Sequence, residues 1–273
     1  MASGKTAVIT GATSGIGAAF AEEFARRGYN LLITGRRTEK LEAVAQRLRD
    51  TYAVAVEVRI LELSDREKVH GFCRQLALRD DIEALVNNAG FGFNEYFSKG
   101  ELDVWEKMTE TQVFAPLAVT HAVLPSMIKR DEGIIINVSS DGAFLLAPKN
   151  TTYAATKSFL KTFTECLHIE LMDTHIKVEA LCPGLTKTDF HEKMGMPQSR
   201  QRNKGIVTWG EPAQVARAAM RALDKGKVLC VPTFGERMLI GFTSLLPRKS
   251  FYSFMFSMSK KLFSSGKGGV QKS

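Results

Sequence analysis

The chain has 273 residues, of which 44% are apolar and 24% charged, and this is the composition of an ordinary globular protein. Its formal net charge of +8 is concentrated at one end: residues 237–273 hold seven Lys or Arg and no acid, while the remainder holds 30 bases and 29 acids. A balanced body with a basic tail lacks the interleaved basic and aromatic surface of a nucleic-acid binder, so we expect no nucleic-acid partner.

Strand-like and helix-like segments alternate along the chain. The apolar runs lie at 5–10, 30–35, 53–61, 82–87, 133–139 and 175–182. They are interleaved with helical patterns at 17–28, 38–50, 65–78, 109–127, 152–173 and 211–223. This alternation predicts an α/β fold, a Rossmann-like, doubly wound parallel sheet of about seven strands with helices on both faces. Ser64 and Glu67 have the spacing of a capping box, and Pro212 suits the first turn of a helix. We expect one domain, with a core of about residues 5–235 and a basic amphipathic tail of about 236–273.

Cysteine and histidine usage indicates neither disulfides nor metal. The four cysteines, Cys73, Cys166, Cys182 and Cys230, lie far apart and form no CxxC pair, so we expect reduced core residues in a cytoplasmic protein. The N-terminal residues have no apolar run of signal-peptide length, which also favours the cytoplasm. None of the five histidines has metal-ligand spacing, and we predict no metal site.

A glycine-rich turn follows the first strand and opens the first helix, with the sequence Thr10-Gly11-Ala12-Thr13-Ser14-Gly15-Ile16-Gly17. Glycines let the backbone approach a pyrophosphate closely, and the free N–H groups of a helix N-terminus favour its charge. A ligand-free connector is the plain alternative, but the strand-turn-helix context favours a dinucleotide site.

Several motifs stand in the same order as in a known family. TGATSGIG is followed by NNAG at Asn87 to Gly90, then by Ser140 with Tyr153-x3-Lys157, and then by Pro183-Gly184. Over about residues 5–235 the sequence thus resembles the short-chain dehydrogenase/reductase family, in particular the NADPH-dependent carbonyl and ketoacyl reductases. The resemblance implies a cofactor site that also contains Asn88, Ala89, Gly90, Tyr153, Lys157, Pro183, Gly184, Thr186 and Thr188.

The end of the second strand predicts which dinucleotide binds. An acid there usually accepts bonds from the ribose 2′-hydroxyl of NAD, whereas a base pairs with the 2′-phosphate of NADP. Gly35 stands where NAD-type members have the acid, and Arg36 and Arg37 follow. Both arginines could instead solvate a helix start, but we predict NADP, with NADPH preferred over NADH. After the third strand, Glu62 with Leu63 replaces the family's adenine-facing Asp-Val.

The predicted reaction centre consists of Ser140, Tyr153 and Lys157. Tyr153 and Lys157 are four residues apart in a helical segment, so both project from one face, and Ser140 follows a strand at the carboxyl edge of the sheet. The resemblance implies that Ser140 bonds the substrate carbonyl, Tyr153 gives a proton, and Lys157 holds the cofactor ribose. Gln112 stands where the family usually has a proton-relay asparagine. Asp141, next to Ser140, could enter the pocket, but we expect it to be an exposed loop acid.

The segments expected to line the substrate pocket are 91–94, 143–146 and Phe190 through Trp209, and their Phe, Leu and Met residues suit an apolar carbonyl compound or alcohol, although they could instead pack on one another. The loop from Asp189 to Thr208 is expected to be a mobile lid. Two other readings remain open: a catalytically impaired, cofactor-binding regulatory protein, and a membrane-recruited scaffold.

The helices at 109–127 and 152–173 carry apolar residues on more than one stripe, which predicts a homodimer or homotetramer. In the tail, Phe251, Phe254, Met255, Met258 and Leu262 share one helical stripe after Pro247, too short to span a bilayer. The stripe either rests peripherally on a membrane or packs on the protein itself.

Overall fold

The computed structural model describes residues 4–190, 194 and 209–264, and its centre is a single parallel sheet. Seven strands lie in the order β3-β2-β1-β4-β5-β6-β7, and every neighbouring pair is parallel. Their bounds are β1 Thr6–Ile9, β2 Asn30–Gly35, β3 Val56–Ile60, β4 Ile82–Asn87, β5 Gly133–Val138, β6 Ile176–Leu181 and β7 Leu229–Cys230. The predicted Rossmann-like, doubly wound sheet is confirmed.

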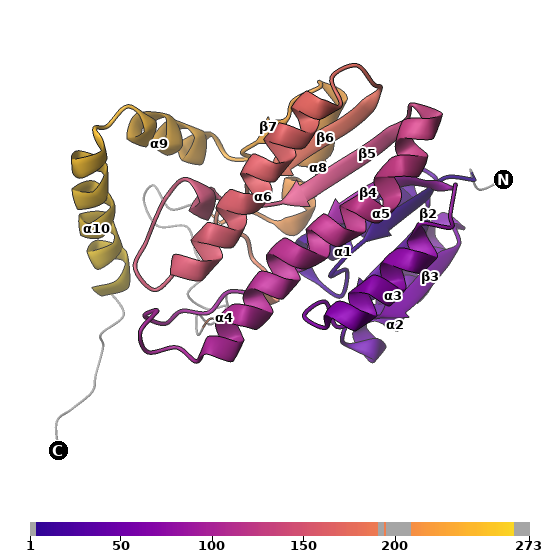
Figure 1. The fold of residues 1–273 in the computed structure, drawn as a ribbon, viewed down its shortest axis with the longest axis horizontal. Coiled ribbons are helices and arrows are strands. Elements are labelled where there is room, and N and C mark those ends of the chain that lie inside the picture. The colour runs from indigo at the N-terminus through magenta and orange to yellow at the C-terminus, as the bar shows by residue number, and fades with distance from the viewer. Residues whose placement is uncertain (1–3, 191–193, 195–208, 265–273) are drawn as a thin grey trace.

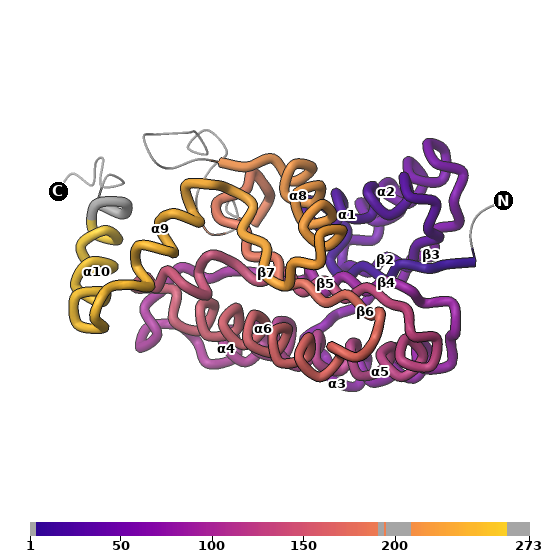
Figure 2. Tube along the Cα trace, turned by 90° about the horizontal axis from the view of Figure 1, so that it is seen from above, coloured from indigo at the N-terminus to yellow at the C-terminus, as the bar shows by residue number. Residues whose placement is uncertain are grey.

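Helices cover both faces of this sheet, as Figures 1 and 2 show. One face carries α1 (Gly15–Arg26), α2 (Thr38–Tyr52) and α8 (Pro212–Asp224), and the other carries α3 (Arg66–Leu76), α4 (Leu102–Thr109), α5 (Ala115–Arg130) and α6 (Thr151–Glu170). The strand order reverses between β1 and β4, so the connections after these two strands diverge to opposite faces and leave a crevice at their carboxyl ends. Ligands of open α/β sheets bind at such a crevice.

Two apolar cores lie on the two faces of the sheet, and a buried polar chain lies on the face that α5 and α6 cover. Phe20 and Phe24 of α1 are fully buried in one core, and Met127 of α5 is fully buried in the other. Asn87 of β4 donates to Asn137 of β5 at 2.8 Å, and the neighbouring bonds continue to side chains of α5 and α6. Buried amides are stable only when bonded, so this chain fixes the two central strands against the helices.

Two local features differ from the sequence-based expectations. The capping box is wrong: Asp65 caps α3 by accepting from the Lys68 N–H at 3.1 Å, while Ser64 donates its N–H and hydroxyl to Glu62. Asp is as good an N-cap as Ser, so a shift of one residue costs little. The helical pattern at 109–127 also contains a π-helical segment, η1 (Glu110–Phe114), between α4 and α5. Such segments occur frequently at functional sites.

The cysteines are all unbridged, but they are not all core residues. Cys182 and Cys230 are buried, whereas Cys73 is half-buried and Cys166 is exposed on α6. The expectation of four core cysteines is therefore wrong for Cys166, because residue type alone does not show which helix face a side chain takes.

The described part of the tail forms two helices, α9 (Phe234–Ser244) and α10 (Arg248–Ser264), where the sequence analysis expected only one, after Pro247. Both lie beyond the carboxyl edge of the sheet, at the opposite end of the molecule from the N-terminus. Phe251 and Met255 of the expected membrane stripe are 5% and 4% exposed, so these two face inward. The Leu262 side chain lies outside the described residues.

One helical run among the described residues, Leu102–Arg130, is long and apolar enough by itself to cross a membrane. It comprises α4, η1 and α5, and 44% of its most apolar window is buried. Val119, Val123 and Met127 are fully buried in one of the two apolar cores, where α5 covers the sheet. The burial of these residues is that of a core helix.

Candidate active site

The glycine-rich turn is held in place by the residues that follow β4. The amide of Asn88 donates to the carbonyl oxygens of Thr10 and Gly11 at 2.9 and 3.0 Å, and the Thr10 hydroxyl accepts from the N–H groups of Asn88 and Ala89. A side chain on Gly17 would collide with the Asn88 amide. The two sequence motifs TGATSGIG and NNAG are thus one structural unit at the β1–β4 crevice.

The turn has the form expected of a dinucleotide phosphate site. Gly15 begins α1 with a φ of +61°, a conformation that favours glycine, and a Cβ there would lie 2.9 Å from Thr188. The first N–H groups of a helix have no partners within it, so residues 15–17 present donors to an anion. The backbone and the glycines of this turn therefore fit a cofactor pyrophosphate.

The two predicted phosphate-binding arginines have different surroundings. Arg37 donates to the hydroxyls of Thr13 and Ser14 at 2.8 and 3.0 Å, and it pairs with Asp189 at 3.0 Å. Arg36 is more exposed and pairs with Glu62 at 3.2 Å, so the residue predicted to face the adenine is turned toward an arginine. Leu63, its neighbour, is buried. Arg37 thus lies against the glycine-rich turn, whereas Arg36 lies at the rim.

Ser140 and Tyr153 meet at the carboxyl end of β5. Ser140 is 7% exposed and its hydroxyl accepts from the Gly142 N–H at 3.0 Å. Burial raises the pKa of Tyr153 well above its ordinary value, and a hydrogen bond with Ser140 partly offsets this. Within the cofactor-free protein Tyr153 is therefore a protonated phenol, the form that can give up a proton.

Lys157 lies one helical turn after Tyr153 in α6 and is 3% exposed. Its ammonium donates to the Val138 carbonyl at 2.8 Å and lies 5.6 Å from the centre of the Tyr153 ring. Burial lowers the pKa of Lys157 to about 8, because desolvation penalises the charged form. The ammonium therefore lies within electrostatic reach of the phenol.

Gln112 is fully buried in η1. Its amide nitrogen donates to the Phe91 carbonyl at 3.0 Å, and its amide oxygen has no hydrogen-bond partner among the described residues. A Cβ on Gly90 would lie 2.8 Å from that oxygen. A buried acceptor of this kind can hold a water molecule, and η1 packs against α6, which carries Lys157.

Two acids next to the reaction centre were not predicted as site residues. Asp141 is not an exposed loop acid: it is partly buried and accepts from the Ser140 hydroxyl at 2.9 Å, and burial raises its pKa. Glu236 of α9 lies against Gly184 and accepts from its N–H, and burial raises its pKa to about 7. The sequence places Asp141 beside Ser140, but no local pattern brings Glu236 to Gly184, which is 52 positions away.

The segment after β6 passes the crevice. Pro183 and Gly184 follow the strand, Thr186 is buried and bonds the Gly184 carbonyl at 3.0 Å, and Thr188 contacts Gly15. Phe190 lies with its ring centre 5.6 Å from that of Tyr153. The rest of the expected lid, residues 191–193 and 195–208, lies outside the described residues.

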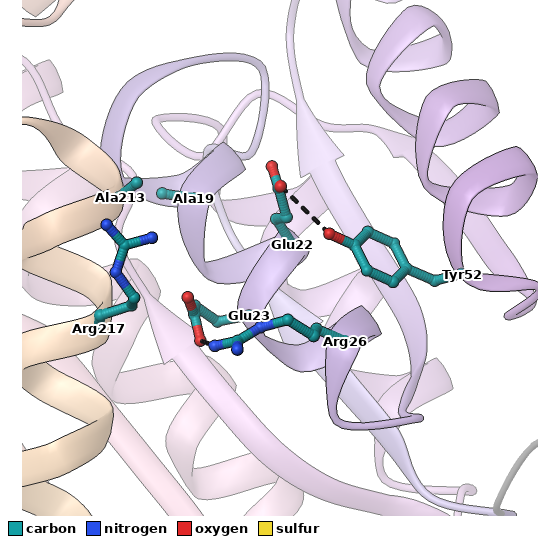
Figure 3. A pocket seen from close by; sticks show the side chains of 7 residues that line it. All are labelled: Ala19, Glu22, Glu23, Arg26, Tyr52, Ala213 and Arg217. Atoms are coloured by element: carbon teal, nitrogen blue, oxygen red, sulfur yellow. Dashed lines mark hydrogen bonds and ion pairs between the residues drawn. The ribbon is translucent and has the colours of Figure 1, made fainter.

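Two clefts elsewhere contain no predicted site residue. Figure 3 shows one of 170 Å³, lined by Ala19, Glu22, Glu23, Arg26, Tyr52, Ala213 and Arg217. Glu22 accepts from the Tyr52 hydroxyl at 3.2 Å, and Glu23 pairs with Arg26, so both acids inside this cleft already have partners. The other, of 580 Å³, lies beside α4. Among the described residues, no group of three His, Cys, Asp or Glu side chains is placed to hold a metal.

The family assignment follows from comparison with known proteins. Residues 5–198, more than two thirds of the chain, match the model of the short chain dehydrogenase family, and the chain therefore belongs to this family. It is an oxidoreductase by family, built on the fold and the cofactor crevice described above.

Individual relatives differ in what their names say of them. An uncharacterized oxidoreductase of Staphylococcus saprophyticus is 33% identical over 81% of this chain and 92% of its own. The mouse very-long-chain 3-oxoacyl-CoA reductase is 30% identical over 95% of this chain and 81% of its own. The human inactive hydroxysteroid dehydrogenase-like protein 1 is 33% identical over 68% of this chain, but this chain covers only 57% of that relative.

Among solved structures, a short-chain dehydrogenase from Sphingobium yanoikuyae in complex with NADPH is similar to this chain. It has a TM-score of 0.79 and 27% sequence identity, and the match covers 98% of both chains. The similarity therefore extends through the tail helices as well as the sheet.

Proposed function

We propose that this protein is a reductase that uses NADPH to reduce the carbonyl group of an apolar ketone or aldehyde, or a dehydrogenase that uses NADP+ to oxidise the corresponding alcohol. The observation that carries the proposal is the meeting of Ser140, Tyr153 and Lys157 beside the glycine-rich turn, with Tyr153 protonated and hydrogen-bonded to Ser140. These three groups provide a hydrogen-bond donor, a proton and a positive charge within one buried site.

The chain's own residues divide the work of such a reaction. The bound nicotinamide supplies the hydride. Ser140 turns its hydroxyl from Asp141 to the substrate oxygen, and Tyr153 gives that oxygen its proton. Lys157, held by the Val138 carbonyl, stabilises the phenolate left on Tyr153 through its charge. In the direction of alcohol oxidation, Tyr153 takes the proton back.

Gln112 is proposed to replace the usual relay asparagine. Its buried, unbonded amide oxygen can accept from a water molecule that returns a proton toward Lys157. Gln112→Ala should then lower kcat while leaving NADPH affinity unchanged. An unchanged kcat would remove this side chain from the relay.

An apolar substrate is supported by the side chains around Tyr153. Phe190 lies tilted against the Tyr153 ring, and Phe93 and Leu146, in the segments expected to line the pocket, are 37% and 38% exposed. The mouse relative's name refers to a very-long-chain 3-oxoacyl-CoA, a long apolar chain with a ketone, which belongs to this substrate class.

A preference for NADPH is supported by the absence of an acid at Gly35 and by two arginines within the described cofactor edge. The Sphingobium structure, similar over the whole chain, holds NADPH. We propose the same cofactor here, with the pyrophosphate at residues 11–17.

The alternative, a cofactor-binding protein with impaired catalysis, is favoured by one finding: a 33% identical human relative carries the word inactive in its name. The Gln112 substitution supports the same reading. Oxidation of NADPH across a panel of lipophilic ketones and aldehydes, with product identified by mass, decides between the two. Tight NADPH binding without turnover of any panel member would support the alternative.

We further propose a cytoplasmic homodimer or homotetramer. Large apolar side chains are exposed on the helices expected at the interface, with Leu117 and Ile128 of α5 at 41% and 48% and Ile169 of α6 at 66%. Exposed apolar groups of this size commonly lie in subunit contacts. Sedimentation at micromolar concentration tests this, and a monomer would contradict it.

Peripheral membrane contact is proposed with a different set of residues from the one expected. Because Phe251 and Met255 face inward, the outward apolar side chains of α9, α10 and the turn between them are Phe234, Met238, Phe242, Leu245, Tyr252 and Phe256. These helices hold five Lys or Arg and no acid after Glu236, and Arg237 and Lys260 lie over the rings of Phe234 and Phe256. Co-sedimentation of the full chain with anionic and neutral vesicles tests this, and Phe242→Ser should weaken the anionic binding. A membrane-recruited scaffold would show this binding without turnover.

A further inference from the structure

The short segment from Thr188 to Phe190 connects the two halves of the candidate site. Thr188 contacts Gly15 of the phosphate-binding turn, and Phe190 lies beside the ring of Tyr153. Asp189, between them, points its carboxylate at Arg37. One tripeptide therefore contacts the phosphate-binding turn, the reaction centre and the cofactor-selecting edge, by which we mean Arg36 and Arg37 after β2.

Asp189 and Arg37 form a partly buried pair. Their nitrogen and oxygen atoms lie 3.0 Å apart, and each side chain is 33% exposed. Lys40 is farther from the same carboxylate, at 3.8 Å. The hydrogen bond from Arg37 lowers the pKa of Asp189, so the carboxylate is charged at neutral pH. The pair is thus a charged contact within the site and not a rim contact.

Both terminal nitrogens of the Arg37 guanidinium already donate to protein acceptors. One terminal nitrogen bonds Asp189, and the other bonds the hydroxyls of Thr13 and Ser14. An arginine binds a phosphate best with two parallel N–H groups, and two anions that share one cation repel each other. A 2′-phosphate at Arg37 therefore meets the Asp189 carboxylate as a competitor for the same guanidinium.

We infer that Asp189 is a specificity-determining residue for the cofactor, because its carboxylate competes with the 2′-phosphate for Arg37. The inference rests on the proposed use of NADPH at this edge. NADH carries no 2′-phosphate and does not enter this competition. Asp189 therefore narrows the preference for NADPH and sets it below what the two arginines alone would give.

A neutral variant of the same shape tests this directly. Asp189→Asn should raise the affinity for NADPH about threefold to tenfold, the effect of a partly exposed charge pair, and change the affinity for NADH less than about twofold. Both affinities are measured by fluorescence titration of the cofactor-free full chain, so that turnover is not the readout. Glu211→Gln is the matched control: it removes one negative charge from a pair with Lys187 at 2.6 Å and should leave both affinities unchanged.

Each outcome distinguishes the competition from its rivals. If Asp189→Asn weakens the binding of both cofactors, the pair instead stabilises the phosphate-binding turn, and the inference is wrong. If the ratio of affinities stays constant while the unmodified protein prefers NADPH, the inference fails and the proposed function stands. If the unmodified protein binds the two cofactors equally but the variant prefers NADPH, the proposed preference fails and the role of Asp189 stands. Equal affinities in both proteins would overturn both.

Discussion

The reaction centre and the cofactor-selecting edge use charge in opposite ways. At the reaction centre Lys157 is 3% exposed, its pKa is lowered to about 8, and its ammonium bonds only a backbone carbonyl among the described residues. At the edge, Arg36 and Arg37 remain partly exposed and each has an acid as partner. Burial thus tunes proton affinity at the centre, whereas pairing and screening set affinity at the edge.

Removing the Tyr153 hydroxyl should give the largest effect and separate the two regions. Tyr153→Phe deletes the proton donor and leaves Phe190 and the ring contact in place, so kcat should fall about 100-fold to 10,000-fold. NADPH affinity, measured by titration, should change less than about threefold. A variant with most of its turnover would show that the proton comes from elsewhere.

Lys157→Met should show how much the burial of the charged Lys157 side chain lowers the free energy of unfolding. Because the pKa of Lys157 is lowered, the folded protein holds fewer protons than the unfolded chain between about pH 8 and its ordinary value of 10.5. The contribution of Lys157 to stability therefore rises with pH across that window and is least favourable below about pH 8. The full change is on the order of 3 kcal/mol.

The measurement for Lys157→Met is the difference in denaturant-derived unfolding free energy between variant and unmodified protein, without cofactor, at several pH values. The difference is needed because burial also raises the pKa of Cys182 and Cys230 to about 12, which lowers stability at high pH in both proteins. We expect the variant's relative stability to decline from pH 7 to pH 10. A constant difference would mean that Lys157 titrates normally.

At the edge, Arg36→Asp should weaken NADPH binding about tenfold to 100-fold, because it removes a cation and adds an anion near the 2′-phosphate and Glu62. The affinity for NADH should fall little or improve, so the preference for NADPH over NADH should narrow or reverse. Arg47→Asp is a control, since Arg47 pairs with Glu22 away from the crevice. Equal NADPH and NADH affinities in the unmodified protein would contradict the assignment before any mutation.

The smallest expected effect is that of salt. Raising NaCl from about 50 mM to about 500 mM should weaken NADPH binding twofold to fivefold, because partly exposed charges are screened. The same change should leave kcat at saturating cofactor nearly constant, because Ser140 and Lys157 are buried. A large fall in kcat would show that the reaction centre is more open to solvent than its burial indicates.

The sequence alone determined the fold class and the motifs of the crevice. Most strand segments are nearly continuous apolar runs because both faces of the sheet are covered, and this pattern needs no tertiary information. The glycine-rich turn and the Tyr153 and Lys157 pair are local patterns of chain geometry, so they could be located before the structure.

Contacts between distant segments were decided only by the tertiary structure. Asp189 reaches Arg37 across 152 positions, and Glu236 reaches Gly184 from a helix that the sequence analysis assigned to a tail. The inward turn of Phe251 and Met255 was equally undetermined, because an apolar stripe predicts burial without naming its partner. Local periodicity fixes which residues share a face, and packing decides what that face meets.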